Sequence, residues 1–194
     1  MLDRLKIVSD SLDRIHEEPR YEIYEGVIYA MAPPSGDHQI LVDEINQQLK
    51  RYFKGKKCQA FIAPFNVNLT EFAESKKKIV FQPDITVVCE PSKYNQRTGT
   101  YMGVPTLIVE VSSPSTRSKD LGEKRFLYEL SGVQEYLFIE DRHSASLFTL
   151  KDNRYTETSY EDDGSGIITI PIPLFPELAI EIREDWFWFG EEQS

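Results

Sequence analysis

A nearly continuous apolar run, residues 106–111, constrains the fold of this 194-residue chain more than any other segment. Such a run is typical of a central strand that is covered on both faces. Glu110 interrupts the run near its end. Because a buried, ionised glutamate without a partner is costly, a metal ion, another cation or water must reach it. The run therefore predicts a covered sheet with a polar site at the end of one strand.

A second acid stands at the start of another strand-like segment. Gln82, Pro83 and Asp84 precede the β-branched run 85–88. If the two strands pair, Asp84 and Glu110 project into one site. Mg²⁺ prefers oxygen ligands and keeps several waters, so two carboxylates suffice to hold it, with the main-chain carbonyl of Val111 as an expected third ligand. The alternative is a turn aspartate and a strand-end glutamate that both lie in solvent.

A predicted helix over residues 119–130 places Asp120, Lys124 and Tyr128 on one face, because they are spaced four residues apart. Gly132 supplies a left-handed C-cap. One interpretation is an exposed ion pair of little energetic consequence. The other is a lysine that reaches the metal centre, where it orients the attacking water or neutralises a scissile phosphate. Spacing alone favours neither.

An earlier helix is predicted to begin near Ser35 or Asp37, both good N-caps. Glu44 lies inside its apolar stripe, between Leu41 and Ile45. A carboxylate at such a position either lies at a cleft, is paired, or marks a stripe edge that stays wet. His38 falls in the first turn of this helix, either as a site neighbour or as a residue that bonds a loop.

The remaining patterns indicate one α/β (α+β) domain over residues 1–194, with a core at about 21–182 built on a mixed sheet flanked by helices. We expect a short helix over 2–15, a β-hairpin over 21–31 that turns at Glu25 and Gly26, and a β-meander of strands 144–150, 154–160 and 166–170. The aromatic tail 186–189 is expected to pack on the body or to cover an oligomer interface.

The net charge of −10 weighs against nucleic-acid binding through a broad basic face. No window of about 18 apolar residues is present, and the N-terminus lacks the apolar core of a signal peptide. We therefore expect a cytoplasmic protein that does not enter the membrane. Cys58 and Cys89 lack the spacing of a zinc or redox site, and we expect both to be reduced, buried thiols.

Several segments together carry a family resemblance. The proline–aspartate pair and the acid on the next strand resemble the skeleton of the PD-(D/E)xK nuclease superfamily. More closely, the chain resembles the Uma-two family of restriction-endonuclease-like proteins, long described as a domain of unknown function. The matching segments are 21–31 with Pro34, Ser35 and His38, then 82–84, then 110–116, then Asp120, Lys124 and Tyr128, and finally 132–136.

The resemblance implies a restriction-endonuclease-like fold and a homodimer that hydrolyses DNA with Mg²⁺ or Mn²⁺. Asp84 and Glu110 would bind the metal, and Glu44 would be the helix acid that often completes such sites. Ser112 stands where the superfamily places its lysine, so Lys124 would be the migrated replacement. The alternatives are a catalytically inactive binding or assembly module with the same fold, and an enzyme that acts on another phosphate ester.

Overall fold

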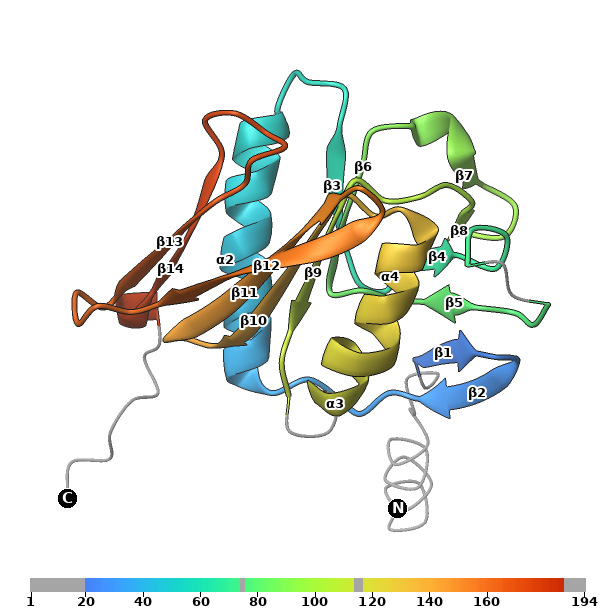
Figure 1. Ribbon diagram of the computed structural model, residues 1–194, viewed down its shortest axis with the longest axis horizontal. Coiled ribbons are helices and arrows are strands. Elements are labelled where there is room, and N and C mark those ends of the chain that lie inside the picture. Colours follow the sequence, from blue (N-terminus) through green and yellow to red (C-terminus); the bar gives the residue numbers. More distant parts are fainter. Residues whose placement is uncertain (1–19, 74–75, 114–116, 187–194) are drawn as a thin grey trace, which may run out of the picture.

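The computed structural model describes residues 20–73, 76–113 and 117–186 (Figure 1). The predicted helix over residues 2–15 and the tail residues 187–189 lie outside this part of the chain. Within it, strands and helices form the mixed α/β arrangement that the sequence predicts, so the expected fold class is confirmed.

A six-stranded mixed sheet forms the centre of the molecule, in the order β12-β11-β10-β9-β6-β3. Its β9 and β10 are parallel, whereas the other neighbours are antiparallel. All five residues of β9 are buried, as the apolar run predicts. The strand bounds are β3 Gln59–Ile62, β6 Ile85–Val88, β9 Leu107–Val111, β10 Glu135–Asp141, β11 Ser144–Lys151 and β12 Arg154–Glu161.

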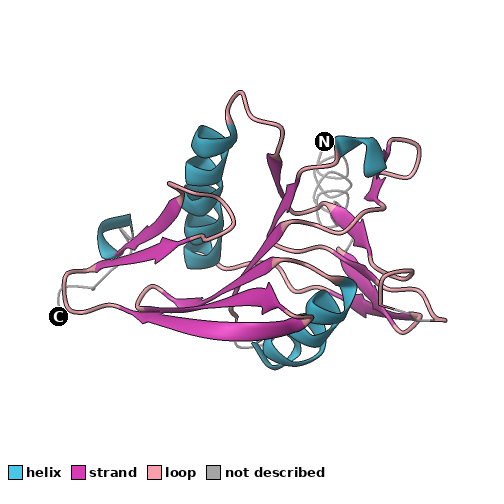
Figure 2. Ribbon diagram, turned by 45° about the horizontal axis from the view of Figure 1, so that its top comes forward, coloured by secondary structure: helices cyan, strands magenta, loops and turns pink. Residues whose placement is uncertain are grey.

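One face of this sheet is covered by helix α2 (Gly36–Phe53) and by the hairpin of β13 (Ile167–Pro171) and β14 (Ala179–Arg183). Figure 2 shows α2 and the second helical segment on opposite sides of the strands. The Ser35 side chain accepts a hydrogen bond from the His38 amide, so the predicted N-cap is confirmed. This interface contains only apolar side chains from β9, namely those of Leu107, Val109 and Val111.

The opposite face carries the second helical segment and a second six-stranded sheet. The helical segment runs through α3 (Arg117–Lys119), a π-helical turn (Asp120–Lys124) and α4 (Arg125–Ser131). It ends at Gly132 in the left-handed conformation, as predicted. The second sheet has the order β2-β1-β5-β4-β8-β7. Its strands are β1 Tyr21–Tyr24, β2 Val27–Ala30, β4 Asn66–Asn68, β5 Val80–Phe81, β7 Tyr94–Asn95 and β8 Thr100–Tyr101.

The predicted N-terminal hairpin and the predicted β-meander have different outcomes. Strands β1 and β2 pair around Glu25 and Gly26, both at positive φ, so the N-terminal hairpin is confirmed. Strands β11 and β12 also pair as predicted. The third strand of the expected meander, β13, instead pairs with β14 in a separate two-stranded sheet. It lies on the α2 side because its buried Ile168 and Ile170 pack into the core there.

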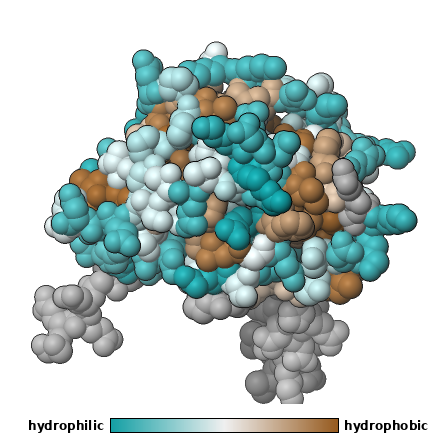
Figure 3. Space-filling view, in the orientation of Figure 1, coloured by the Kyte–Doolittle hydropathy of each residue, from teal (hydrophilic) through white to brown (hydrophobic). Residues whose placement is uncertain are grey.

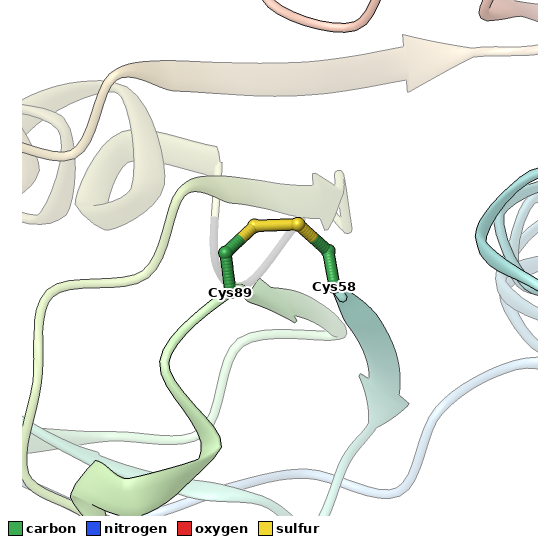
Figure 4. The surroundings of a disulfide bond; sticks show 2 residues. All are labelled: Cys58 and Cys89. Atoms are coloured by element: carbon green, nitrogen blue, oxygen red, sulfur yellow. A yellow bond between two sulfur atoms is a disulfide. The ribbon is translucent and has the colours of Figure 1, made fainter. Parts of the chain in front are cut away.

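The prediction of reduced cysteines is wrong. Cys58 and Cys89 form a disulfide (Figure 4). Gln59 of β3 pairs with Val88 of β6 in antiparallel register, so the residues just outside this pair, Cys58 and Cys89, face each other. The strand pairing, which sequence spacing did not reveal, therefore brings the two thiols together.

Within the described ranges, no helix is long and apolar enough to cross a membrane.

Candidate active site

A pocket of about 490 Å³ opens on the face of the central sheet opposite α2. Its polar lining comes from β1, from the residue just before β6, from the end of β9 and the residues after it, from the start of α2, and from α3 and the π-helical turn. Its other wall is the apolar segment from the end of β2 to the start of α2. The polar lining residues include Arg20, Glu22, His38, Asp84, Glu110, Ser112, Lys119, Asp120 and Lys124.

Strand register brings the two predicted acids together. Ile85 pairs with Val109, so Asp84 and Glu110 lie opposite each other one position further along the antiparallel strands. Each carboxylate accepts a backbone N–H from the other strand: the Val111 amide donates to Asp84 Oδ2 over 2.9 Å, and the Asp84 amide donates to Glu110 Oε2 over 3.3 Å. His38 Nε2 lies 3.0 Å from the same Asp84 Oδ2.

Glu110 lies among groups that shift its pKa in opposite directions. Lys124 Nζ and the Tyr128 hydroxyl both donate to Glu110 Oε1, each over 2.9 Å. Burial raises the pKa of Glu110, Lys124 lowers it, and the nearby carboxylates of Asp120, Asp84 and Glu22 raise it again, to about 8. Burial and the adjacent Glu110 hold the Tyr128 pKa well above its usual value, so this hydroxyl stays protonated.

Lys124 is the centre of a buried charge cluster. Its Nζ lies 2.9 Å from Glu110 Oε1, 2.9 Å from Glu22 Oε1 and 3.2 Å from Asp120 Oδ1. The contact with Asp120 Oδ1 is an ion pair that lacks hydrogen-bond geometry. Burial disfavours the ammonium, but the three carboxylates outweigh it and hold the Lys124 pKa well above its usual value. The lysine therefore stays charged. The exposed ion pair considered from the sequence is not what the structure contains.

Glu22 and Lys119 belong to the site although the sequence did not single them out. Glu22 lies on β1, and its Oε2 accepts a 2.8 Å hydrogen bond from Lys119. Burial would raise the Glu22 pKa, but Lys124 and Lys119 together lower it. Glu22 interrupts the strand-like run 21–24 much as Glu110 interrupts its own run, so its position could mark it as a candidate but could not place it in this site.

Of the remaining candidate residues, some line the pocket and one does not. Val111 and Ser112 line the pocket beside Glu110. Glu44 does not: it lines a different hollow, between α2 and β14. The structure therefore does not bring Glu44 to the pocket that holds Asp84 and Glu110. Helix α2 packs on the face of the sheet that carries Val109, whereas Glu110 points to the other face.

The donor set of the pocket suits a hard divalent cation. Among the described residues, no three His, Cys, Asp or Glu side chains already converge in metal-binding geometry. Two facing carboxylates nevertheless satisfy Mg²⁺, which retains much of its water shell. Asp84 and Glu110 would supply these oxygens, and the ammonium of Lys124 lies 2.9 Å from Glu110 Oε1. The residues present therefore fit a magnesium or manganese ion.

Two proteins of Synechocystis sp. resemble the chain in sequence. One, described as "Uncharacterized protein slr1290", is 26% identical over 124 residues, covering 63% of this chain and 62% of that protein. The other, "Uncharacterized protein sll1609", is 28% identical over 120 residues, covering 61% and 65%. Each match thus spans less than two thirds of the relative's length.

A solved structure shares the fold. It is the crystal structure of a "putative nuclease belonging to DUF820" from Anabaena variabilis, with a TM-score of 0.68 and 17% sequence identity. The match covers 92% of this chain and 97% of that one. The central sheet and its covering layers are therefore an arrangement already seen in a crystal.

The model of one protein family matches most of the chain. That family, Uma2, is described as "Putative restriction endonuclease", and its model matches residues 8–183. This span contains both facing acids, both lysines and the apolar wall of the pocket. The chain belongs to the Uma2 family.

Proposed function

We propose that this protein is a divalent-metal-dependent nuclease that hydrolyses phosphodiester bonds in DNA. The observation that carries the proposal is the close approach of Asp84, just before β6, to Glu110 of β9, each accepting an N–H from the other segment, inside a pocket that also holds two lysines. Family membership supports the same reaction class. Asp84, Glu110 and the Val111 carbonyl would hold Mg²⁺ or Mn²⁺.

The roles of the chain's own residues follow from their contacts. A bound cation would lower the pKa of a water and offset charge on the phosphoryl oxygens. His38 orients Asp84, and Tyr128 and Lys124 orient Glu110. In hydrolysis the attacking water gives up a proton to solvent as its oxygen bonds to phosphorus. The phosphorus–ester oxygen bond breaks, and the departing oxygen takes up a proton from solvent. Asp120 forms an ion pair with Lys124, and Ser112 lines the pocket next to Val111.

The test is a plasmid-nicking assay with Mn²⁺ that compares the wild type with Asp84→Asn and Glu110→Gln. Each substitution keeps the side-chain shape and removes a ligand charge, so we expect nicking to fall by roughly a hundredfold or more. Glu44→Gln is the matched control, an acid outside the pocket whose loss should leave nicking unchanged. Nicking that survives in both site variants would refute the assignment.

A second candidate is a catalytically inactive binding module. It is favoured by the serine at position 112 and by the three carboxylates that surround Lys124. Isothermal titration separates the two candidates, because a working site of two carboxylates should bind Mn²⁺ at roughly millimolar concentration. Absence of binding in the wild type would favour the inactive module.

A further inference from the structure

The pocket has one wall that the hydrolytic site does not require. Residues 29–34 are six consecutive apolar residues, Tyr-Ala-Met-Ala-Pro-Pro, and all of them line the pocket. Tyr29 is 42% exposed, and its neighbours on β2, Val27 and Ile28, are also exposed. Figure 3 shows hydrophobic residues at the surface in the region of the β1–β2 hairpin. An apolar wall beside a cluster of charges is suited to a ligand that has both kinds of surface.

Positive charge in the pocket is scarce. Of the described lining residues, Arg20, Lys119 and Lys124 are the cations. Lys124 is 4% exposed and already contacts three carboxylates, whereas Lys119 is 23% exposed and contacts Glu22. The Nη2 atom of Arg20 is buried without a hydrogen-bond partner. Lys119 and Arg20 suffice for one or two phosphates, but strong duplex binding usually rests on many such contacts.

The cation and the aromatic ring are neighbours. Lys119 Nζ lies 4.7 Å from the centroid of the Tyr29 ring. A nucleotide likewise places a phosphate close to a base that can stack on an aromatic side chain. In an intact duplex the bases are stacked on each other and are not available to such a ring. An unpaired strand offers both groups together.

We propose that the pocket takes unpaired nucleic acid, with Lys119 and Arg20 on the phosphate and Tyr29 stacked on the adjacent base. The substrate is then a single strand or a locally opened duplex rather than an intact duplex. This inference names the substrate of the proposed nuclease and rests on that function for the cleavage step. Strand binding, however, is measured independently of cleavage.

Fluorescence anisotropy with Ca²⁺ in place of Mg²⁺ measures that binding. The probes are a labelled oligothymidine strand and the same strand annealed to oligoadenosine. We expect the single strand to bind at least about tenfold more tightly than the duplex. Loss of one base stack predicts a roughly 5- to 150-fold weaker single-strand complex for Tyr29→Ala. Tyr29→Phe keeps the ring and should bind like the wild type, whereas Tyr29→Leu keeps the bulk and should not.

Lys119 is tested in the same assay. Lys119→Gln should weaken single-strand binding and flatten its salt dependence, and Lys119→Arg should restore both. Ile28→Ala is the matched control, because Ile28 is exposed on the same strand but does not line the pocket. Tighter binding of the duplex, or binding that is unchanged in Tyr29→Ala and Tyr29→Leu, would overturn the proposal.

The two proposals fail in different ways. If Tyr29-dependent strand binding persists but Mn²⁺ gives no cleavage that depends on Asp84, the nuclease assignment fails and the strand site stands. If Asp84-dependent cleavage occurs on intact duplex alone, the nuclease assignment stands and the strand site is overturned.

Discussion

The two faces of the central strand β9 carry different kinds of side chain. On the α2 side, Leu107, Val109 and Val111 pack among other buried apolar residues. On the α4 side, Ile108 is followed by Glu110, which contacts Lys124 and Tyr128. The first face contributes the hydrophobic free energy of burial. The second places ionised groups in the interior, where each is tolerated only because its partners are present. The proposed site thus lies on one face of β9, which also buries Ile108, whereas the other face of the strand is apolar throughout.

The largest effect is expected from Lys124→Met. This substitution leaves Glu110, Glu22 and Asp120 buried without their shared cation, and removal of one partner of a buried ion pair costs about 3–5 kcal/mol. Because the acids can become protonated at low pH, the loss should be larger at about pH 8 than at about pH 5.5. Urea denaturation at both pH values measures it.

Leu137→Ala is the counterpart on the apolar face. Leu137 is fully buried in the α2-side core, so its truncation should cost about 2–5 kcal/mol. No titratable group is involved, and the loss should be the same at both pH values. If the Lys124 variant showed the same pH-independent loss, the contrast between the two faces would be wrong.

Removal of the disulfide should have the next largest effect. Cys58 and Cys89 are 31 residues apart, and cross-linking a loop of that length stabilises a fold by about 3–4 kcal/mol in the chain-entropy model. The Cys58→Ser, Cys89→Ser double variant should lose this amount of unfolding free energy relative to the oxidised wild type. Wild type treated with dithiothreitol is the control, and should match the double variant.

A change of pH is expected to have a smaller effect, both on the free energy of unfolding and on the affinity for Mn²⁺. The Glu110 pKa rises from 4.5 to about 8 in the fold, so between these values the folded chain binds more protons than the unfolded chain. Unfolding free energy of the metal-free protein therefore falls as pH rises through this window. A cation must displace the proton, so Mn²⁺ affinity should rise up to about tenfold per pH unit below about pH 8.

Calorimetric titration with Mn²⁺ at about pH 6, 7 and 8, in buffers of different ionisation enthalpy, counts the protons released. Glu110→Gln should show a weaker affinity that depends less on pH. A wild-type Mn²⁺ affinity that does not change between about pH 6 and pH 8 would mean that Glu110 does not hold the displaced proton.

The smallest change in unfolding free energy is expected at an exposed ion pair between β12 and helix α4. Arg154 pairs with Glu129 of α4 over 3.1 Å, but the arginine side chain is 80% exposed. Arg154→Ala should change the unfolding free energy by less than about 1 kcal/mol, as is usual for surface pairs. Thermal unfolding of this variant beside Lys124→Met compares an exposed and a buried ion pair at one helix. A loss as large as that of Lys124→Met would contradict the comparison.

The sequence predicted that Asp84 and Glu110 lie together, because each acid stands at a strand whose apolar run is evident from the sequence. Asp84 and Glu110 each stand beside an apolar run, and a buried charge in such a run needs a partner wherever the strand lies. Glu44 shows the limit of the same argument. Its position in an apolar stripe indicates proximity to the core, but not which face of the sheet the helix covers.

The position of Glu22, the disulfide and the pairing of β13 depend on contacts between segments that local sequence patterns do not reveal. Glu22 reaches the site because β1 pairs with β5, and β5 lies some 60 residues further along the chain, a separation that local patterns do not encode. The disulfide likewise depends on the register of β3 with β6. The third strand of the meander was misassigned because its alternation is the same whether it joins β12 or β14.

The π-helical turn sets the spacing of the two lysines. Residues five apart in a regular α-helix point about 140° away from each other, and Lys119 and Lys124 would then face different neighbours. In the π-helical turn the Arg125 amide donates to the Asp120 carbonyl, five residues back, and the wider turn brings side chains at this spacing closer to one face. Both lysines thereby reach the two oxygens of one carboxylate, Glu22. The wide turn acts as a one-residue insertion: it lets two lysines five residues apart reach one carboxylate, whereas a regular α-helix would require them to be four residues apart.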